Sequence, residues 1–466
     1  MSTFGCNQQT ADSNCSGPAY RDTYSVAIVS HFGGGACIGC TFNHLTFMNA
    51  GGGACIFIDT YLVVSNPGPE IGGELGLNGQ LIPVASETTA PSTVLSNDCH
   101  VIDCTFHNVG QSIQGNVLND HSTVYCGASN STIAGNFFYN DYYSGQQTAG
   151  TTAIEVHGSS TIVQNNFVIN YGTGVNLCNQ NGDPIGTTAV QIEDNNFYIV
   201  YKAIVFWTSD SDSLPHFLQD VWFMNNWIHA RPSNYPIIDH TSDIKSISGG
   251  YTDGLYIIGN QLFAYTDASC RPSPSLDYVL CSVLDAVGVP PIPLEEVVCS
   301  GTTSTVNQMV GVWLRFAKNI VINENQIFDL LSEGIWLLED SSFAQWSETI
   351  TGFEIANNLL VNLGISTTST PSRVIALEGG DRNRPLSCGS LDGNTIDNTT
   401  ADTAVPNSVV AIAFNAFSGG ILSNVCISPN NVIEPSADSF IGITGQSPSA
   451  SAAQFGVPPC QVCQNP

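Results

Sequence analysis

A six-residue motif recurs along most of the chain and constrains the fold more than any other feature. Its clearest copy is Ile162-x-x-Asn165-x-Phe167, with apolar residues three positions before and two positions after an asparagine. The other copies with asparagine are Ile133-x-x-Asn136-x-Phe138, Ile192-x-x-Asn195-x-Phe197, Trp222-x-x-Asn225-x-Trp227, Ile257-x-x-Asn260-x-Leu262, Ile322-x-x-Asn325-x-Ile327, Ile355-x-x-Asn358-x-Leu360, Leu391-x-x-Asn394-x-Ile396 and Ile421-x-x-Asn424-x-Cys426. Two copies carry cysteine in place of the asparagine: Cys37-x-x-Cys40-x-Phe42 and Val101-x-x-Cys104-x-Phe106.

The copies follow one another at intervals of about 29 to 36 residues, except for two intervals of about 65. A fixed period of this length is typical of solenoids, in which each unit buries its apolar face against its neighbours. The two long intervals predict additional units with a degenerate motif near residues 72 and 290. The pattern as a whole therefore predicts roughly a dozen coils.

The composition of the motif favours strands over helices. Each copy is short, rich in Ile, Val and Phe, and flanked by Gly, Ser, Thr and Asn, as strands are. Asparagine tolerates the left-handed backbone conformation that a bend between strands needs. Asparagines stacked in successive coils can also form a ladder of side-chain hydrogen bonds. We therefore expect an all-β solenoid, a parallel β-helix, with motif asparagines such as Asn165 and Asn225 in one column.

An unbroken repeat predicts one elongated domain, although 466 residues could form two or three. We expect an N-terminal cap or attachment segment over residues 1–30, the β-helix over 31–430, and a C-terminal cap and tail over 431–466. Stretches rich in Pro and Gly or bearing several cysteines predict loop excursions near 65–98 and 268–305.

The chain is poor in charge and strongly acidic, with 10 basic against 39 acidic residues and a net charge of -29. Such a surface repels phosphate backbones, so no nucleic-acid partner is expected. No run of 18 apolar residues is present, so no membrane span is expected. The first residues lack the basic and apolar regions of a secretory signal. Together with the initial methionine, this favours release by assembly into a virus particle over ordinary secretion.

Sixteen cysteines are many for a protein kept in a reducing compartment. The candidate disulfide cysteines lie near the two ends and in the second excursion: Cys6, Cys15, Cys270, Cys281, Cys299, Cys460 and Cys463. Buried free thiols are the alternative. The pairs Cys37-x-x-Cys40 and Cys460-x-x-Cys463 have a spacing found at zinc sites, but no histidine follows at zinc-finger spacing. No metal site is therefore expected there.

A second apolar strand precedes the motif in most coils, and its outward side chains can carry chemistry. Segments 153–160, 203–210, 237–243, 312–318, 335–342, 374–381 and 411–418 align in one register. Strand alternation then directs one set inward: Ile154, Val156, Ile204, Phe206, Val312, Leu314, Trp336, Leu338, Ile375, Leu377, Ile412 and Phe414. The outward column reads His157, Trp207, His240, Arg315, Glu339, Glu378 and Asn415. Asp239 falls on an inward position, which requires either a partner for a buried carboxylate or a slip of the register.

Glu339 and Glu378 are the candidate catalytic residues, because successive coils would stack them about 4.8 Å apart. Two crowded carboxylates, with Arg315 one coil away, suit acid and base catalysis at a glycosidic bond, since crowding raises the pKa of one of them. The alternative interpretation is a surface ladder of ion pairs, which would contain the same arginine and the same two glutamates.

Trp207 is the candidate carbohydrate platform, with His157 and His240 beside it in the same column. A tryptophan packed beneath a loop is the alternative interpretation. Asp210, Asp212 and Asp340 have oxygen ligands that suit Ca²⁺, although acids in turns are often only solvated. Apart from this calcium candidate, no cofactor is expected.

The coil motif, as in IVQNNFVIN, IEDNNFYIV and IIGNQLFAY, resembles the right-handed parallel β-helix proteins of the pectate-lyase-like superfamily. That superfamily includes polysaccharide lyases, polygalacturonase-type hydrolases and many bacteriophage tailspikes. The resemblance covers residues 35 to 430 and implies a single-stranded right-handed helix; for tailspikes it also implies a homotrimer. Of the polygalacturonase signatures only His157-Gly158 is present, so that activity is not implied. Arg315 is the best match to the catalytic base of pectate lyases.

The sequence therefore favours a virion surface structural protein, either a tailspike or a capsid or tail decoration, located on the virion surface or outside the cell. Its expected partners are other virion proteins and a host-surface polysaccharide. The second hypothesis is an extracellular polysaccharide-degrading enzyme, a glycoside hydrolase or lyase. The third is a secreted adhesin in which the repeat acts only as a spacer.

Overall fold

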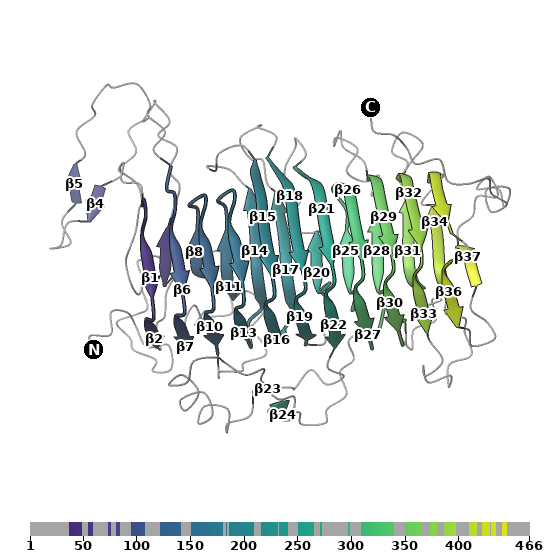
Figure 1. Ribbon diagram of the computed structural model, residues 1–466, viewed down its shortest axis with the longest axis horizontal. Coiled ribbons are helices and arrows are strands. Elements are labelled where there is room, and N and C mark those ends of the chain that lie inside the picture. Colours follow the sequence, from purple (N-terminus) through teal and green to yellow (C-terminus); the bar gives the residue numbers. More distant parts are fainter. Residues whose placement is uncertain are drawn as a thin grey trace.

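The computed structural model describes the chain over residues 37–48, 55–58, 73–75, 81–83, 95–107, 122–140, 151–179, 183, 186–208, 216–231, 233–240, 250–264, 271–272, 297–298, 309–339, 350–364, 373–379, 386–397, 410–416, 422–428, 430–434 and 440–444. Each coil contributes one short strand to each of three sheets, and each sheet has eleven strands within these residues. The coils stack side by side along the long axis of the molecule (Figure 1). The expected all-β parallel β-helix is confirmed.

Sheet 1 holds the first strand of every coil: β1 (Thr41–Asn43), β6 (His100–Ile102), β9 (Thr132–Ala134), β12 (Ile162–Gln164), β15 (Thr187–Glu193), β18 (Phe217–Met224), β21 (Tyr251–Ile258), β26 (Ala317–Asn323), β29 (Thr351–Ala356), β32 (Leu386–Asp392) and β35 (Leu422–Ile427).

Sheet 2 holds the second strand: β2 (Thr46–Met48), β7 (Thr105–His107), β10 (Phe137–Tyr139), β13 (Phe167–Ile169), β16 (Asn196–Val200), β19 (Trp227–Ala230), β22 (Gln261–Ala264), β27 (Gln326–Phe328), β30 (Leu359–Val361), β33 (Thr395–Asp397) and β36 (Val432–Glu434).

Sheet 3 holds the third strand: β3 (Ile56–Ile58), β8 (Ser122–Cys126), β11 (Thr152–Val156), β14 (Thr173–Asn179), β17 (Lys202–Thr208), β20 (Ile238–His240), β25 (Val312–Leu314), β28 (Ile335–Leu338), β31 (Arg373–Gly379), β34 (Val410–Ala416) and β37 (Phe440–Thr444).

Within the described residues, the two long intervals of the repeat add no strand to the three sheets. β1 pairs directly with β6, and β21 pairs directly with β26, so the predicted coils near residues 72 and 290 are not formed. Instead, β4 (Gly73–Leu75) pairs antiparallel with β5 (Leu81–Pro83), and β23 (Arg271–Pro272) pairs antiparallel with β24 (Val297–Val298). Both pairs lie outside the three sheets (Figure 1).

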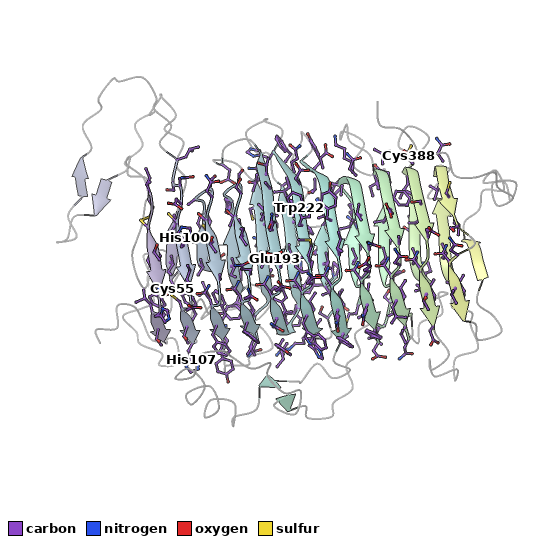
Figure 2. All side chains as sticks on the ribbon, viewed as in Figure 1. Cys55, His100, His107, Glu193, Trp222 and Cys388 are labelled. Atoms are coloured by element: carbon purple, nitrogen blue, oxygen red, sulfur yellow. A yellow bond between two sulfur atoms is a disulfide. The ribbon has the colours of Figure 1, made fainter. Side chains whose placement is uncertain are left out.

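The interior of the helix is filled by one continuous apolar cluster that runs from Cys37 to Ile412. Residues at the same position in successive coils stack on one another, so that side chains form rows along the long axis (Figure 2). The rings of Phe47 and Phe106 stack with centroids 5.1 Å apart, and those of Phe106 and Phe138 stack at 4.7 Å. Each coil therefore buries its apolar face against its neighbours, as the repeat predicts.

The asparagine ladder forms at the turn between sheet 1 and sheet 2, but not with all of the expected residues. Side-chain hydrogen bonds of 2.9 to 3.0 Å join Asn136, Asn166, Asn195, Asn226, Asn260, Asn325, Asn358, Asn394 and Asn431 in sequence. The expectation for Asn165, Asn225 and Asn424 is wrong. Asn165 and Asn225 instead precede a ladder residue and hold positive φ angles of 54°. In the first coil Leu45, not Cys40, aligns with Cys104 at the ladder position.

Within the described residues, Cys37 and Cys40 form a disulfide, and Cys388 and Cys426 are also disulfide-bonded. Buried free thiols are found at Cys55, Cys99, Cys104, Cys126 and Cys178. The candidate disulfide cysteines Cys6, Cys15, Cys270, Cys281, Cys299, Cys460 and Cys463 lie outside the described residues. Among the residues that the structure does describe, no helix is long and apolar enough to cross a membrane.

Candidate functional site

The outward face of sheet 3 carries two columns of side chains that follow the long axis. The first column reads Tyr125, Glu155, Asn176, Val205, Asp239, Trp313, Trp336 and Ala376. The second lies two residues further along each strand and includes His157, Cys178, Trp207, Arg315, Leu338 and Glu378. Between them, an inward column reads Cys126, Val156, Leu177, Phe206, His240, Leu314, Leu337 and Leu377.

The predicted outward position of His240 is wrong. Ile238, one residue later than expected, aligns with Ile204, so His240 follows Phe206 into the interior. The two rings stack at 5.5 Å, and the Nε2 of His240 forms a hydrogen bond of 2.6 Å with the Oγ1 of Thr252. Burial lowers the pKa of His240 to about 4. The same slip places Asp239 on the outward face, where its Oδ2 lies 2.6 Å from the Nζ of Lys202.

The predicted stack of Glu339 on Glu378 is also wrong. Ile335 and Leu337 point inward in place of Trp336 and Leu338, so the outward neighbour of Glu378 in the preceding coil is Leu338. Glu339 comes one residue later, and its backbone N–H donates to the carbonyl of Glu378. Its carboxylate accepts a hydrogen bond of 2.8 Å from the backbone N–H of Ile350, where sheet 3 leads into sheet 1.

A first group of polar side chains surrounds His157 near the N-terminal end of the face. The Nδ1 of His157 lies 2.7 Å from the Oδ2 of Asp183, and its Nε2 lies 3.0 Å from the Oε1 of Glu155. The Sγ of Cys178 lies 3.7 Å from the same Glu155 oxygen, and the hydroxyl of Ser122 donates to the other one. We name Glu155, His157, Cys178 and Asp183 the His157 cluster.

The His157 cluster is almost closed to solvent, since His157 and Glu155 are each 4% exposed. Burial alone would lower the pKa of His157, but Asp183, Tyr125 and Cys178 together outweigh it and hold this pKa well above its ordinary value. Burial raises the pKa of the Cys178 thiol to about 12, with Glu155 adding to the effect. Both ring nitrogens of His157 are engaged within the cluster, so neither points toward a sugar.

A second group lies further along the face and is built around two tryptophans. The rings of Trp313 and Trp336 stack with centroids 4.1 Å apart and an interplanar angle of 8°. The guanidinium of Arg315 lies 4.9 Å from the Trp313 ring, and that of Arg373 lies 5.0 Å from the Trp336 ring. We name these four residues the tryptophan stack. Both tryptophans are half-buried, and within the described residues their indole N–H groups have no hydrogen-bond acceptor.

Two carboxylates hold Arg373 in its place beside Trp336. Its Nε donates to the Oε1 of Glu333 at 2.8 Å, and its Nη1 donates to Glu378. Burial would lower the pKa of Arg373, but these two carboxylates raise it instead. Ala376, the residue opposite Trp336 on β31, is fully buried. Glu378 thus belongs to an ion-pair network that also includes Glu333, a residue that the sequence alignment does not reach.

Trp207 stands apart from the tryptophan stack, next to Cys178 in the second outward column. It is half-buried, and among the described residues no acceptor lies within hydrogen-bonding distance of its indole N–H. The structure thus places four predicted residues in the second outward column. His157 and Trp207 lie in its earlier coils, and Arg315 and Glu378 lie in its later coils. It removes His240 and Glu339 from that face. The candidate calcium ligands Asp210, Asp212 and Asp340 lie outside the described residues.

No known family model matches the chain, and no curated protein sequence matches it. Among solved structures, it is similar to the tailspike protein of the E. coli bacteriophage HK620 in complex with a pentasaccharide, at 16% identity and a TM-score of 0.47, over 81% of this chain and 54% of that chain. It is also similar to the catalytic unit of an α-1,3-glucanase from Streptomyces thermodiastaticus, at 11% identity and a TM-score of 0.36, over 75% of this chain and 50% of that chain. The chain thus spans about half the length of these structures, and the likeness concerns the β-helix alone.

Proposed function

We propose that the protein is a virion surface protein that binds a host-surface glycan through the outward face of sheet 3. The observation that carries this proposal is the tryptophan stack, in which half-buried indoles and guanidinium groups lie together on one face of a rigid β-helix. Guanidinium groups are hydrogen-bond donors, and the hydroxyl groups of sugars accept from them. Function on rigid scaffolds commonly sits on such a surface and the loops around it.

The geometry of the stack also limits how a sugar can bind there. The facing sides of Trp313 and Trp336 are covered by each other, so a sugar is contacted through indole edges and the adjacent guanidinium groups. Glu333 and Glu378 neutralise Arg373, and the net charge of the whole chain is -29. Because the electrostatic field of this negative charge repels anions at long range, we expect a neutral glycan and not an acidic one.

The test is binding of the full-length protein to a panel of neutral and acidic glycans. We expect Trp313→Ala and Trp336→Ala to weaken binding to the best neutral glycan at least about tenfold, as loss of a central aromatic contact does. Trp222→Ala is the matched control, because Trp222 also stacks in a half-buried aromatic pair, with Tyr256, but on sheet 1 (Figure 2). Unchanged affinity in both sheet 3 variants, or equal loss in the control, would overturn the proposal.

The virion location and the homotrimer are separate parts of the proposal with their own measurements. Peptide mass spectrometry of purified virus particles should find the chain, and its gene should lie beside capsid or tail genes. Sedimentation equilibrium should give three times the chain mass of 49.4 kDa. A soluble monomer in medium free of particles would support the secreted adhesin instead.

A second candidate function is cleavage of the bound polysaccharide, which carboxylates on the same face of sheet 3 support. Glu333 and Glu378 both bind one guanidinium beside Trp336, so two carboxylates lie next to the stack. We expect Glu378→Gln to lower the release of new reducing ends at least about a hundredfold if Glu378 acts as acid or base. Glu339→Gln is the control, since the amide oxygen can still accept from Ile350. Unsaturated products would indicate a lyase, in which Arg315 is the candidate base.

A further inference from the structure

The His157 cluster takes no part in the proposed glycan site, yet it gathers a carboxylate, an imidazole and a thiol in the wall of the β-helix. We propose that Glu155, His157 and Cys178 bind a Zn²⁺ ion. The Oε1 of Glu155, the Nε2 of His157 and the Sγ of Cys178 all lie within 4.8 Å of one another, and all three residues are buried.

The strand register explains why these three side chains meet. Glu155 and His157 lie two residues apart at the end of β11, so alternation places both on the outward face. β14 pairs with β11 so that Cys178 follows Leu177, the partner of Val156, and stands beside His157 in the next coil. Neighbouring strands lie about 4.8 Å apart, so the column spacing alone brings the thiol within reach. The site therefore depends on the sheet and not on a loop.

The distances suit a tetrahedral zinc ion with little movement. With typical bond lengths to zinc, a tetrahedral site needs about 3.4 Å between its nitrogen and oxygen ligands and about 3.6 Å between sulfur and oxygen. The corresponding distances here are 3.0 Å for His157 and Glu155 and 3.7 Å for Cys178 and Glu155. Zn²⁺ would take the position between Nε2 and Oε1, and the fourth ligand would be water.

The surroundings of the three ligands match those of a metal-bound histidine. Histidine ligands usually donate their other ring N–H to a carboxylate, which fixes the tautomer that leaves the metal-binding nitrogen free. Here the Nδ1 of His157 lies 2.7 Å from Asp183. Ser122 donates to the second oxygen of Glu155, and the Tyr125 ring packs against the imidazole with centroids 4.5 Å apart. These contacts hold Nε2 and Oε1 toward the same point.

The chemistry of the three ligands selects among divalent cations. Ca²⁺ and Mg²⁺ prefer six or more oxygen ligands, whereas thiolate and imidazole prefer zinc. A thiolate and a carboxylate also balance the two charges of Zn²⁺, so the buried site gains no net charge. The ion would join β11 to β14 near the N-terminal end of the stack, with a structural role.

The test is zinc binding by the full-length folded protein, measured by equilibrium dialysis against Zn²⁺ with elemental analysis. Co²⁺ then serves as a spectroscopic probe, because thiolate ligation gives an intense charge-transfer absorption. We expect the wild type to bind Zn²⁺ and to show this absorption with Co²⁺. Cys178→Ala should remove both, Glu155→Gln should weaken zinc binding, and Asp183→Asn should weaken it about 10- to 100-fold by freeing the imidazole.

Cys126→Ala is the matched control, because Cys126 is a buried free thiol on β8 whose side chain faces the interior. It should keep the zinc affinity and the cobalt absorption of the wild type. Circular dichroism on each variant checks that the β-helix is still folded. The proposal is overturned if the wild type binds no zinc, if folded Cys178→Ala keeps the cobalt absorption, or if Cys126→Ala loses it. In those cases the His157 cluster is only a hydrogen-bond network.

Discussion

At the scale of single residues, Asn225 and Asn226 show that one turn needs two different properties from adjacent positions. Asn225 is exposed and holds a φ of 54°, so it supplies the left-handed conformation of the bend. Asn226 is 1% exposed and links three coils through its side chain. Its Nδ2 donates to Ile192 and Asn260, and its Oδ1 accepts from Asn195, each at 3.0 Å.

We therefore predict that Asn226→Ala is far more destabilising than Asn225→Ala. Loss of the Asn226 side chain leaves the carbonyl of Ile192 and the N–H of Asn195 buried without their partners, at a cost of at least about 3 kcal/mol. Asn225→Ala adds only the strain of a left-handed alanine, about 1 kcal/mol. Urea unfolding midpoints of the two variants measure the difference. Equal midpoints would show that the ladder contributes little to stability.

His240 predicts a specific loss of stability in mild acid. Burial lowers its pKa in the folded protein to about 4, below the ordinary 6.5 that applies when the chain is unfolded. The unfolded chain therefore takes up the proton first, so the stability present above pH 6.5 is lost as the pH falls toward 4. The loss reaches about 3 kcal/mol at pH 4.

Thermal unfolding midpoints at pH 7 and pH 5 measure this loss. His240→Leu matches the neighbouring Phe206 and Leu314 in apolarity, so it should lower the midpoint at pH 7 by freeing Thr252 but reduce the difference between the two pH values. His100→Asn, which changes the exposed pair of His100 with Asp98, is the control and should keep the wild-type difference. An unchanged difference in His240→Leu would contradict the prediction. His229, whose pKa burial also lowers to about 4, accounts for acid sensitivity that remains.

At the scale of the strands, the sequence predicts the type of element better than its register. The period and the Ile, Val and Phe content of the motif are sufficient for a parallel β-helix, because no other arrangement buries such short strands at that spacing. Register fails where neighbouring residues are alike. Ile237 and Ile238, or Leu337 and Leu338, give no alternation to distinguish inward from outward, and a slip of one residue exchanges the two faces. That slip misplaces His240 and Glu339.

The candidate sites show the same limit. Alternation alone places Glu155 and His157 on one face, but Cys178 belongs to β14, a strand absent from the sequence alignment of this sheet. Asp183 comes from the segment after β14, where no pattern indicates a partner for His157. Glu333 lies just before the aligned segment 335–342, and Arg373 lies just before the segment 374–381. The sequence therefore identifies part of each site, and pairing between coils supplies the rest.

The connection between β11 and β12 predicts that Gly158 cannot be replaced. A Cβ at Gly158 would lie 1.9 Å from the carbonyl oxygen of Ala128 in the preceding coil, and this backbone atom cannot move aside without disturbing the stack. Gly158→Ala should therefore lower the unfolding midpoint, with a loss of about 2 kcal/mol or more. Ser159→Ala, at the next position, is the comparison and should cost less, because it loses only the hydrogen bond that the backbone N–H of Thr188 donates to the Ser159 hydroxyl. Similar midpoints for wild type and Gly158→Ala would mean that the coils separate easily at this corner.

At the scale of the whole molecule, the stack of coils is continuous across both long intervals of the repeat. β21 pairs with β26 and β20 pairs with β25, although the chain between β22 and β25 includes residues 268–305. The sheets on either side are thus joined by their own hydrogen bonds and by the shared apolar core. A solenoid of this kind gains its stability from contacts between neighbouring coils, so an insertion in one connection adds little to it.

We therefore predict that removal of residues 268–305 leaves the β-helix folded. The shortened connection would be similar in length to residues 231–237, which join β19 to β20, and shorter loops cost less entropy to close. Circular dichroism should keep the strand signal, and the thermal midpoint should stay within about 5 °C of the wild type. The deletion also removes Cys270, Cys281 and Cys299. A protein that unfolds far earlier or fails to fold would therefore show that disulfides in this excursion, and not the pairing of β21 with β26 alone, hold the two halves of the stack together.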